Sequence, residues 1–112
     1  MEKSPGNLLC FPINVRILNR AFTEITCDPK KYQRTLNSRA LDFSLAVKVF
    51  VGLHLTREDT RKDYGEKRFV TFGTLEGVMV VLVWTDRFPS LHVISMRRAN
   101  NRERKAYQVI HH

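Results

Sequence analysis

Cysteine is scarce in this chain of 112 residues, and long apolar runs are missing. Cys10 and Cys27 lie far apart with no histidine at ligand spacing, which argues against a zinc site and fits two free thiols in a reducing cytoplasm. No stretch approaches the roughly 20 apolar residues that cross a bilayer. The apolar stretch 8–13 is too short for a signal sequence and contains Pro12. We therefore expect a cytoplasmic protein with no metal, no cofactor and no membrane partner.

Acidic residues are also few beside the basic ones. The chain has 19 Lys and Arg against 11 Asp and Glu, which gives a net charge of +8. This balance predicts attraction to nucleic acid, to an acidic protein or to an anionic membrane surface, but it does not predict a fold. A content of 43% apolar and 27% charged residues is ordinary for a globular domain. Residues 1–21 show no clear period, so we expect an N-terminal extension there, flexible or the product of an early start codon, before one domain at 22–112.

Two helix signals follow the extension. Asp28 precedes Pro29, the usual order of an N-cap and a first helical position, and predicts a helix to about Asn37. Asp42 is the next cap candidate, and apolar residues follow it at i, i+3, i+4 and i+7, the spacing of a core-facing helix. These stripe residues are Phe43, Ala46, Val47 and Phe50.

Apolar and β-branched runs after residue 53 predict four strands and a closing helix. The expected strands are 54–57, 67–75, 78–84 and 91–96. The run 78–84 is apolar throughout, so we place it centrally and interpret Trp84 as a core residue, with base stacking as the alternative. Asn100 or Asn101 caps the last helix, and from Asn100 the side chain of Glu103 completes a capping box. The fold class is α+β: a twisted antiparallel sheet packed against two N-terminal helices, with a C-terminal helix and a basic cleft on the other face.

The segment 91–107 is the most informative one, because an apolar strand runs directly into paired arginines and a basic helix. Guanidinium groups bind phosphate oxygens bidentately and stay protonated near neutral pH. The segment therefore favours a polyanionic partner, and we interpret the chain as a small RNA-cutting domain. Its five cations are opposed by Glu103 alone; they are Arg97, Arg98, Arg102, Arg104 and Lys105.

Several motifs in order resemble the BrnT family, the toxins of bacterial type II toxin–antitoxin pairs. The resemblance covers about residues 22–108 and rests on 28–31, 42–50, 56–59, 64–69, 94–99 and 102–107. It implies a RelE-like fold and a ribonuclease that stops translation. It also implies RNA as the substrate and a BrnA antitoxin as the partner. The antitoxin would carry a DNA-binding domain of the ribbon-helix-helix type, and the toxin would contact DNA only through it. The chain departs from the family pattern at 37–39, where a Lys-His-Gly turn is usual, and at Cys27, where Trp is common.

Cutting RNA without a metal requires attack by the 2′-hydroxyl, a base, an acid and cations that stabilise the phosphorane. Arg97 and Arg98 are the first candidates, as clamps on the scissile phosphate. Successive residues of a strand point to opposite faces, so one of the two can instead serve the antitoxin interface or a structural ion pair. An exposed basic surface without chemistry is the remaining alternative.

Three further residues are candidates for the same reaction. Glu66 and Arg68 lie two apart on one strand face, where Glu66 can act as base or hold a guanidinium and Arg68 can bind phosphate. A plain salt bridge is the alternative for this pair. Tyr107, one helical turn beyond Glu103, can offer its hydroxyl to the site, stack on a base or anchor the last helix in the core. Candidate RNA-binding residues, for which exposed charge alone is the alternative, are Arg57, Arg61, Arg102, Arg104 and Lys105.

Two other functions stay open at this point. A nucleic-acid-binding module that does not cut would share the same charge and aromatic residues. An interaction protein whose basic cleft receives an acidic partner would also fit, because the altered turn at 37–39 removes a histidine that can contribute to chemistry.

Overall fold

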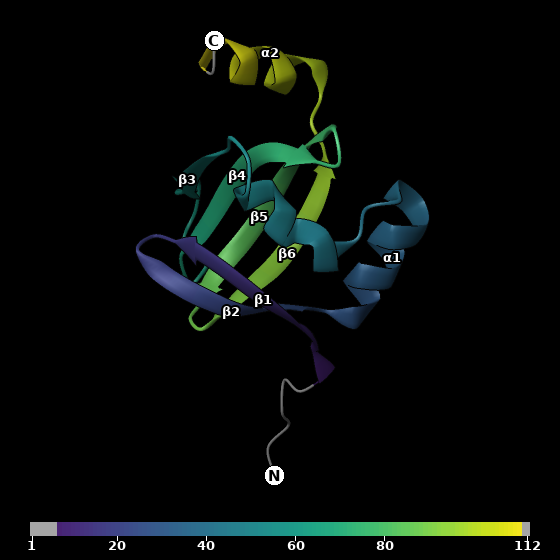
Figure 1. The fold of residues 1–112 in the computed structure, drawn as a ribbon, viewed down its shortest axis with the longest axis vertical. Coiled ribbons are helices and arrows are strands. Elements are labelled where there is room, and N and C mark those ends of the chain that lie inside the picture. The colour runs from purple at the N-terminus through teal and green to yellow at the C-terminus, as the bar shows by residue number, and fades with distance from the viewer. Residues whose placement is uncertain (1–6, 111–112) are drawn as a thin grey trace.

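A six-stranded mixed sheet forms the centre of the structure, a computed structural model that describes residues 7–110 (Figure 1). In chain order the elements are β1 (Leu9–Ile17), β2 (Arg20–Cys27), α1 (Pro29–Arg39), the 3-10 helix η2 (Phe43–Phe50), β3 (Leu55–Asp59), β4 (Arg68–Leu75), β5 (Val78–Arg87), β6 (Ser90–Arg98) and α2 (Asn101–Ile110). The strand order across the sheet is β1-β2-β6-β5-β4-β3. Strands β2 and β6 are parallel, and every other neighbouring pair is antiparallel.

The expected RelE-like arrangement, an antiparallel sheet packed against two N-terminal helices, is therefore wrong. A β-hairpin, β1–β2, comes before the first helix, and its second strand joins β6 in parallel. The second helix is a 3-10 helix rather than an α-helix. The C-terminal helix is confirmed, and so are strands at each of the four expected places after residue 53.

Strand β1 lies in the segment for which we expected an extension. It pairs with β2 from Leu9 to Ile17, and the side chain of Ile17 is buried in the core. The sequence pattern missed this strand because Pro12 looks like a breaker, whereas an edge strand tolerates proline at a position that needs no ladder hydrogen bond. Residues 1–6 lie outside the described part of the chain, and the division of the chain at Phe22 stays a prediction.

The large core lies between the sheet and η2. Asp42 begins η2 as expected, with its Oδ1 accepting from the backbone N–H of Ser44 at 2.9 Å. The buried side chains of η2 follow a spacing of three, which is the period of a 3-10 helix. They are Phe43, Ala46 and Val49, joined by Phe50 at the end; Val47 from the expected stripe is only partly buried. Trp84 of β5 is fully buried beneath them and donates its indole N–H to Thr71, so its interpretation as a core residue is confirmed.

Gly73 of β4 allows η2 to cross the sheet closely. A Cβ atom at this position would lie 2.8 Å from Cγ1 of Val49 and 3.1 Å from its carbonyl oxygen. The opposite face of the sheet is much less covered, because Val70, Val81 and Ala99 form only a small second cluster there. Helix α2 extends beyond the end of the sheet at the top of Figure 1, away from η2. Within residues 7–110, no helix is long and apolar enough to span a membrane.

Candidate nucleic-acid interface

A groove of about 400 Å³ crosses the sheet face opposite η2. Its floor is mainly apolar and comes from three neighbouring strands: Val70, Phe72, Val81, Val83 and Ser95. Alternation along β5 explains the separation of the two faces, because Val81 and Val83 point into the groove while Leu82 and Trp84 point into the large core. Three arginines line the groove: Arg57 from β3, Arg61 from the following loop and Arg97 from β6. Three carboxylates also line the groove, those of Glu58, Asp59 and Glu103, so acidic groups equal the arginines in number and the expected basic cleft stays a prediction.

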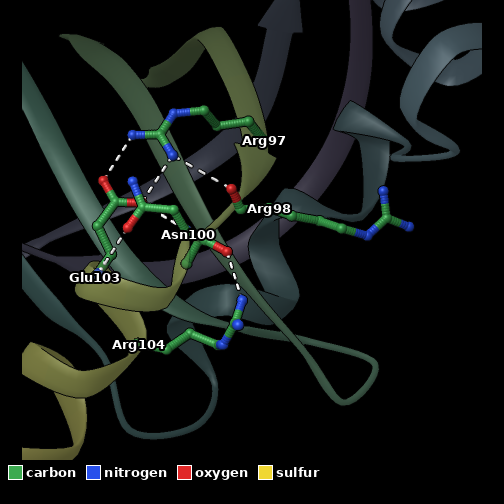
Figure 2. Close-up of polar contacts among 6 residues, drawn as sticks. Arg97, Arg98, Asn100, Glu103 and Arg104 are labelled. Atoms are coloured by element: carbon green, nitrogen blue, oxygen red, sulfur yellow. Dashed lines mark hydrogen bonds and ion pairs between the residues drawn. The ribbon is translucent and has the colours of Figure 1, made fainter.

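Arg97 enters the groove already bound to Glu103 (Figure 2). Its two terminal nitrogens donate to the two carboxylate oxygens at 2.8 and 2.7 Å. Glu103 also accepts the backbone N–H of Asn100 at 2.9 Å, while Asn100 Oδ1 accepts the backbone N–H of Glu103 at 2.8 Å, so the predicted capping box is confirmed. The hydrogen bonds from Arg97 lower the pKa of Glu103 to about 2. The Arg97 side chain remains 44% exposed, which leaves donors open to a ligand.

Arg98 points the other way, as Figure 2 shows. Its Nη1 donates to the carbonyl oxygen of Arg39, the last residue of α1, at 2.6 Å. Arg39 in turn donates to the carbonyl oxygen of Met96 in β6 at 2.9 Å. The two arginines therefore tie the C-terminal end of α1 to β6, where the helix dipole favours cations. The structure does not bring Arg97 and Arg98 to one phosphate.

Asp59 organises the wall of the groove at the end of β3. Arg61 donates two hydrogen bonds of 2.8 Å to the carboxylate of Asp59, and the hydroxyl of Tyr64 donates to the same carboxylate at 3.1 Å. These donors hold the pKa of Asp59 far below its usual range, with Arg61 the main cause. Tyr64 also packs its ring on the guanidinium of Arg68, 4.1 Å from the ring centroid. Arg68 therefore lies in a small network, although its buried Nε has no hydrogen-bond partner among the described residues.

Glu66 lies just before β4 and is bound to Arg87 rather than to Arg68, the partner that the sequence offered for a salt bridge. Arg87 donates to its two carboxylate oxygens at 3.4 and 3.1 Å and is the main cause of a lowered pKa for Glu66. His92 is influenced by the charges of both residues, and burial lowers its pKa to about 4, so its ring is neutral at pH 7. Its Nδ1 shares a hydrogen bond of 2.9 Å with Thr26.

The sheet register separates these candidates into two groups on one face. Arg68 pairs with Thr85 of β5, whereas Arg97 pairs with Val81, four residues away. That spacing corresponds to about 13 Å along the strand. Arg97 lines the groove, whereas Arg68 does not, and Glu66 lines a separate pocket formed by the loop between β3 and β4.

Helix α2 carries the remaining candidates. Tyr107 lines a second pocket and donates its hydroxyl to the carbonyl oxygen of Leu53 at 2.7 Å. Arg102 lines the same pocket, while Arg104 donates to the carbonyl oxygen of Ala99 at 2.8 Å and Lys105 is exposed. Of the five expected RNA-binding residues, only Arg57 and Arg61 line the groove itself.

Sequence reasoning missed the carboxylates and cations that position the site. Glu103 was assigned to capping alone, and Asp59 and Arg87 had no role at all. The capping box was the available signal for Glu103, because a carboxylate at the third helical position lies close to the strand that precedes the cap. Nothing in the linear sequence marks the pairing of Glu66 with Arg87, which depends on the register of β4 and β5.

A family model matches more than half of the chain. Residues 27–103 match the family model described as "Ribonuclease toxin, BrnT, of type II toxin-antitoxin system". The match runs from the last residue of β2 to Glu103, so it contains the groove, the Asp59 network and the Arg97–Glu103 pair. No curated protein matches the chain. The family description implies an RNA substrate and an antitoxin partner. The chain belongs to the BrnT family of ribonuclease toxins of type II toxin–antitoxin systems.

Proposed function

We propose that the chain is an endoribonuclease that cuts RNA without a metal ion and thereby inhibits translation. The observation that carries this proposal is the groove itself, where Arg57, Arg61 and Arg97 surround an apolar floor within the segment matched to the toxin family. A ribose–phosphate strand lying along the groove would place its phosphates against the guanidinium groups and its bases near Phe72. The two acidic partners, Asp59 and Glu103, hold two of these guanidinium groups in fixed positions.

The proposed chemistry is transfer within the RNA strand. The 2′-oxygen loses its proton and forms a bond to the adjacent phosphorus, and the bond from phosphorus to the 5′-oxygen breaks. The leaving 5′-oxygen takes a proton from water, so that a 2′,3′-cyclic phosphate and a 5′-hydroxyl result. Arg68 lies nearest to Glu66 along the strand and would neutralise the charge that develops on the scissile phosphate. Arg97 and Arg57 would bind another phosphate farther along the same strand. Arg98, which closes α1 against β6, takes no part in this scheme.

Glu66 is the proposed proton acceptor. Arg87 lowers its pKa, so the carboxylate is ionised at neutral pH and can receive the proton of the 2′-hydroxyl. Tyr107 would act by fixing α2 over the groove rather than by proton transfer, because its hydroxyl already donates to Leu53. Arg102, Arg104 and Lys105 extend the positive surface along α2 and would attract RNA over a longer distance.

The test is a cleavage assay of purified protein on defined RNA, in EDTA and in magnesium. We expect equal rates in both and products that end in a 2′,3′-cyclic phosphate. Arg68→Ala and Glu66→Gln should lower the maximal rate, whereas Arg97→Ala should mainly raise the RNA concentration needed. Cleavage that requires magnesium, or a mobility shift without cleavage, would overturn the proposal; the second result would favour the binding module.

The antitoxin is proposed to be a BrnA-like protein with a ribbon-helix-helix DNA-binding domain. The toxin would then contact DNA only through this partner, in a complex that represses its own operon. Expression of the chain should arrest growth and protein synthesis, and co-expression of the neighbouring gene should relieve both. A shift of operator DNA by the toxin alone would contradict this part of the proposal.

A further inference from the structure

An apolar pocket of about 380 Å³ lies beside the groove, between α2 and the edge of the sheet. Leu55 of β3 and Phe72 of β4 form one side, and Ala106 and Tyr107 of α2 form the other. Edge strand β3 has no neighbour on its outer side among the described residues, and α2 covers this corner with Arg102, Glu103, Ala106 and Tyr107. The pocket therefore exposes apolar surface at the edge of the sheet in a strongly basic protein.

Large apolar side chains are exposed next to this pocket. Leu53, whose carbonyl oxygen accepts the hydroxyl of Tyr107, is 69% exposed, and Val51 in the same loop is 80% exposed. A monomeric protein rarely exposes several such side chains together, and a contiguous apolar patch marks a site for a protein partner. Arg57 and Arg102 also line the pocket, so the apolar surface is bordered by positive charge.

We infer that this pocket receives the antitoxin, through an acidic segment that inserts at least one aliphatic or aromatic side chain. The net charge of +8 and the arginines at the border of the pocket favour an acidic partner. The apolar lining favours an apolar side chain of that partner, which is removed from water when it enters the pocket. Arg57, Phe72 and Glu103 line both this pocket and the RNA groove. A segment seated here would therefore cover one end of the groove. The inference rests on the proposed function only for this last step, the loss of RNA access.

Two substitutions leave the groove arginines unchanged and add a charge to this surface, Ala106→Glu in the lining of the pocket and Leu53→Asp beside it. Leu53→Asp changes an exposed loop side chain, and Ala106→Glu changes an exposed residue of α2 to a good helix former. Leu18→Asp is the matched control, because Leu18 is another exposed leucine, 46% exposed, in the turn between β1 and β2. Thermal unfolding of each variant identifies any that do not fold.

The antitoxin encoded beside the toxin gene is the probe, measured by calorimetry and by its ability to stop RNA cleavage. We expect Leu53→Asp and Ala106→Glu each to weaken binding at least about tenfold, while free toxin cuts RNA as before and Leu18→Asp binds as the wild type does. Unchanged antitoxin affinity in both pocket variants would overturn the inference. So would a wild-type chain that is dimeric alone and becomes monomeric on Leu53→Asp, because a second copy would then occupy the pocket. Absence of RNA cleavage by the free toxin would instead overturn the proposed function and leave the binding result intact.

Discussion

The guanidinium of Arg97 and the carboxylate of Glu103 meet through two parallel hydrogen bonds, the geometry in which arginine also binds a phosphate. The carboxylate thus occupies the position where an RNA phosphate would bind Arg97. RNA that engages Arg97 fully must displace Glu103 or share the guanidinium with it. The pair holds Arg97 in place in the free protein, and we expect it to lower the affinity of Arg97 for RNA.

Glu103→Gln should tighten RNA binding by about fivefold, because two unit charges about 4 Å apart in water interact with roughly 1 kcal/mol. Glutamine preserves the capping box, since its side-chain oxygen still accepts the N–H of Asn100. The free energy of unfolding should fall by up to about 1 kcal/mol, because the ion pair is lost from a partly exposed site. Fluorescence anisotropy with labelled RNA and urea denaturation measure the two effects. Weaker RNA binding in this variant would show that Glu103 supports the RNA-bound state.

Stability should decrease as the pH falls from about 5 toward 2. Arg97 lowers the pKa of Glu103 to about 2, Arg61 lowers that of Asp59, and Arg87 lowers that of Glu66, whereas unfolded carboxyls titrate near 4. The unfolded chain therefore takes up these protons first, and the stabilisation that is complete above about pH 5 is lost on acidification. Urea denaturation at several pH values measures this. Glu103→Gln should reduce the slope of the free energy of unfolding against pH. An unchanged slope would contradict the lowered pKa of Glu103.

Arg97→Ala and Arg98→Ala should have different effects although the residues are adjacent. Loss of Arg97 removes one cation from the groove, so the salt dependence of RNA binding should become shallower by about 0.7 in the logarithmic slope. Loss of Arg98 removes the hydrogen bond to Arg39 and should lower the free energy of unfolding by about 1 kcal/mol. Equal RNA affinities of the two variants would contradict the separation of the two side chains.

Gly73→Ala should destabilise the fold by about 1–3 kcal/mol, because the added methyl group would contact Val49 in η2. Gly52→Ala is the matched control, since a Cβ atom there has no neighbour within 4 Å, and it should change stability by less than about 0.5 kcal/mol. Urea denaturation of both variants measures the difference. Similar stabilities would mean that η2 does not pack on β4 as closely as described.

Only one of the two thiols should react in the native protein. Cys10 is exposed, although a hydrogen bond to Glu24 raises its pKa. Cys27 is buried, and burial raises its pKa to about 11. A colorimetric thiol assay at pH 8 should therefore count one cysteine in the native protein and two in urea. Cys10→Ser should remove the native signal, and rapid reaction of Cys27 would contradict its place in the core.

Local signals in the sequence predicted local structure well. Asp28, Asp42 and Asn100 cap the helices that they were expected to cap, and the turn at Glu76 and Gly77 has the positive φ angles of a tight hairpin. The first hairpin was missed because its turn uses Leu18 and Asn19, which also adopt positive φ, where Asn-Gly is the usual signal.

Relationships between distant segments were not predictable in the same way. The parallel pairing of Ile25 with Leu91 joins strands more than sixty residues apart, and no pattern within either strand specifies its partner. Arg97 lines the groove, and strand alternation, which was weighed as an alternative, explains why Arg98 does not. The roles of the site residues remain predictions.

The order of strands in the sheet determines when the sheet can be completed during synthesis of the chain. Within residues 7–110, the hairpin β1–β2 is made before the other strands, whereas β6, the strand that joins it to β5, is made after them. Strand β6 pairs with β2 along one edge and with β5 along the other, so it joins the hairpin β1–β2 to the strands β3–β5. A nascent chain that ends before Ser90 therefore has a hairpin that cannot yet pair with the rest of the sheet. The groove floor includes Ser95 of the same strand, so the proposed RNA-binding surface is complete only after β6 has been made.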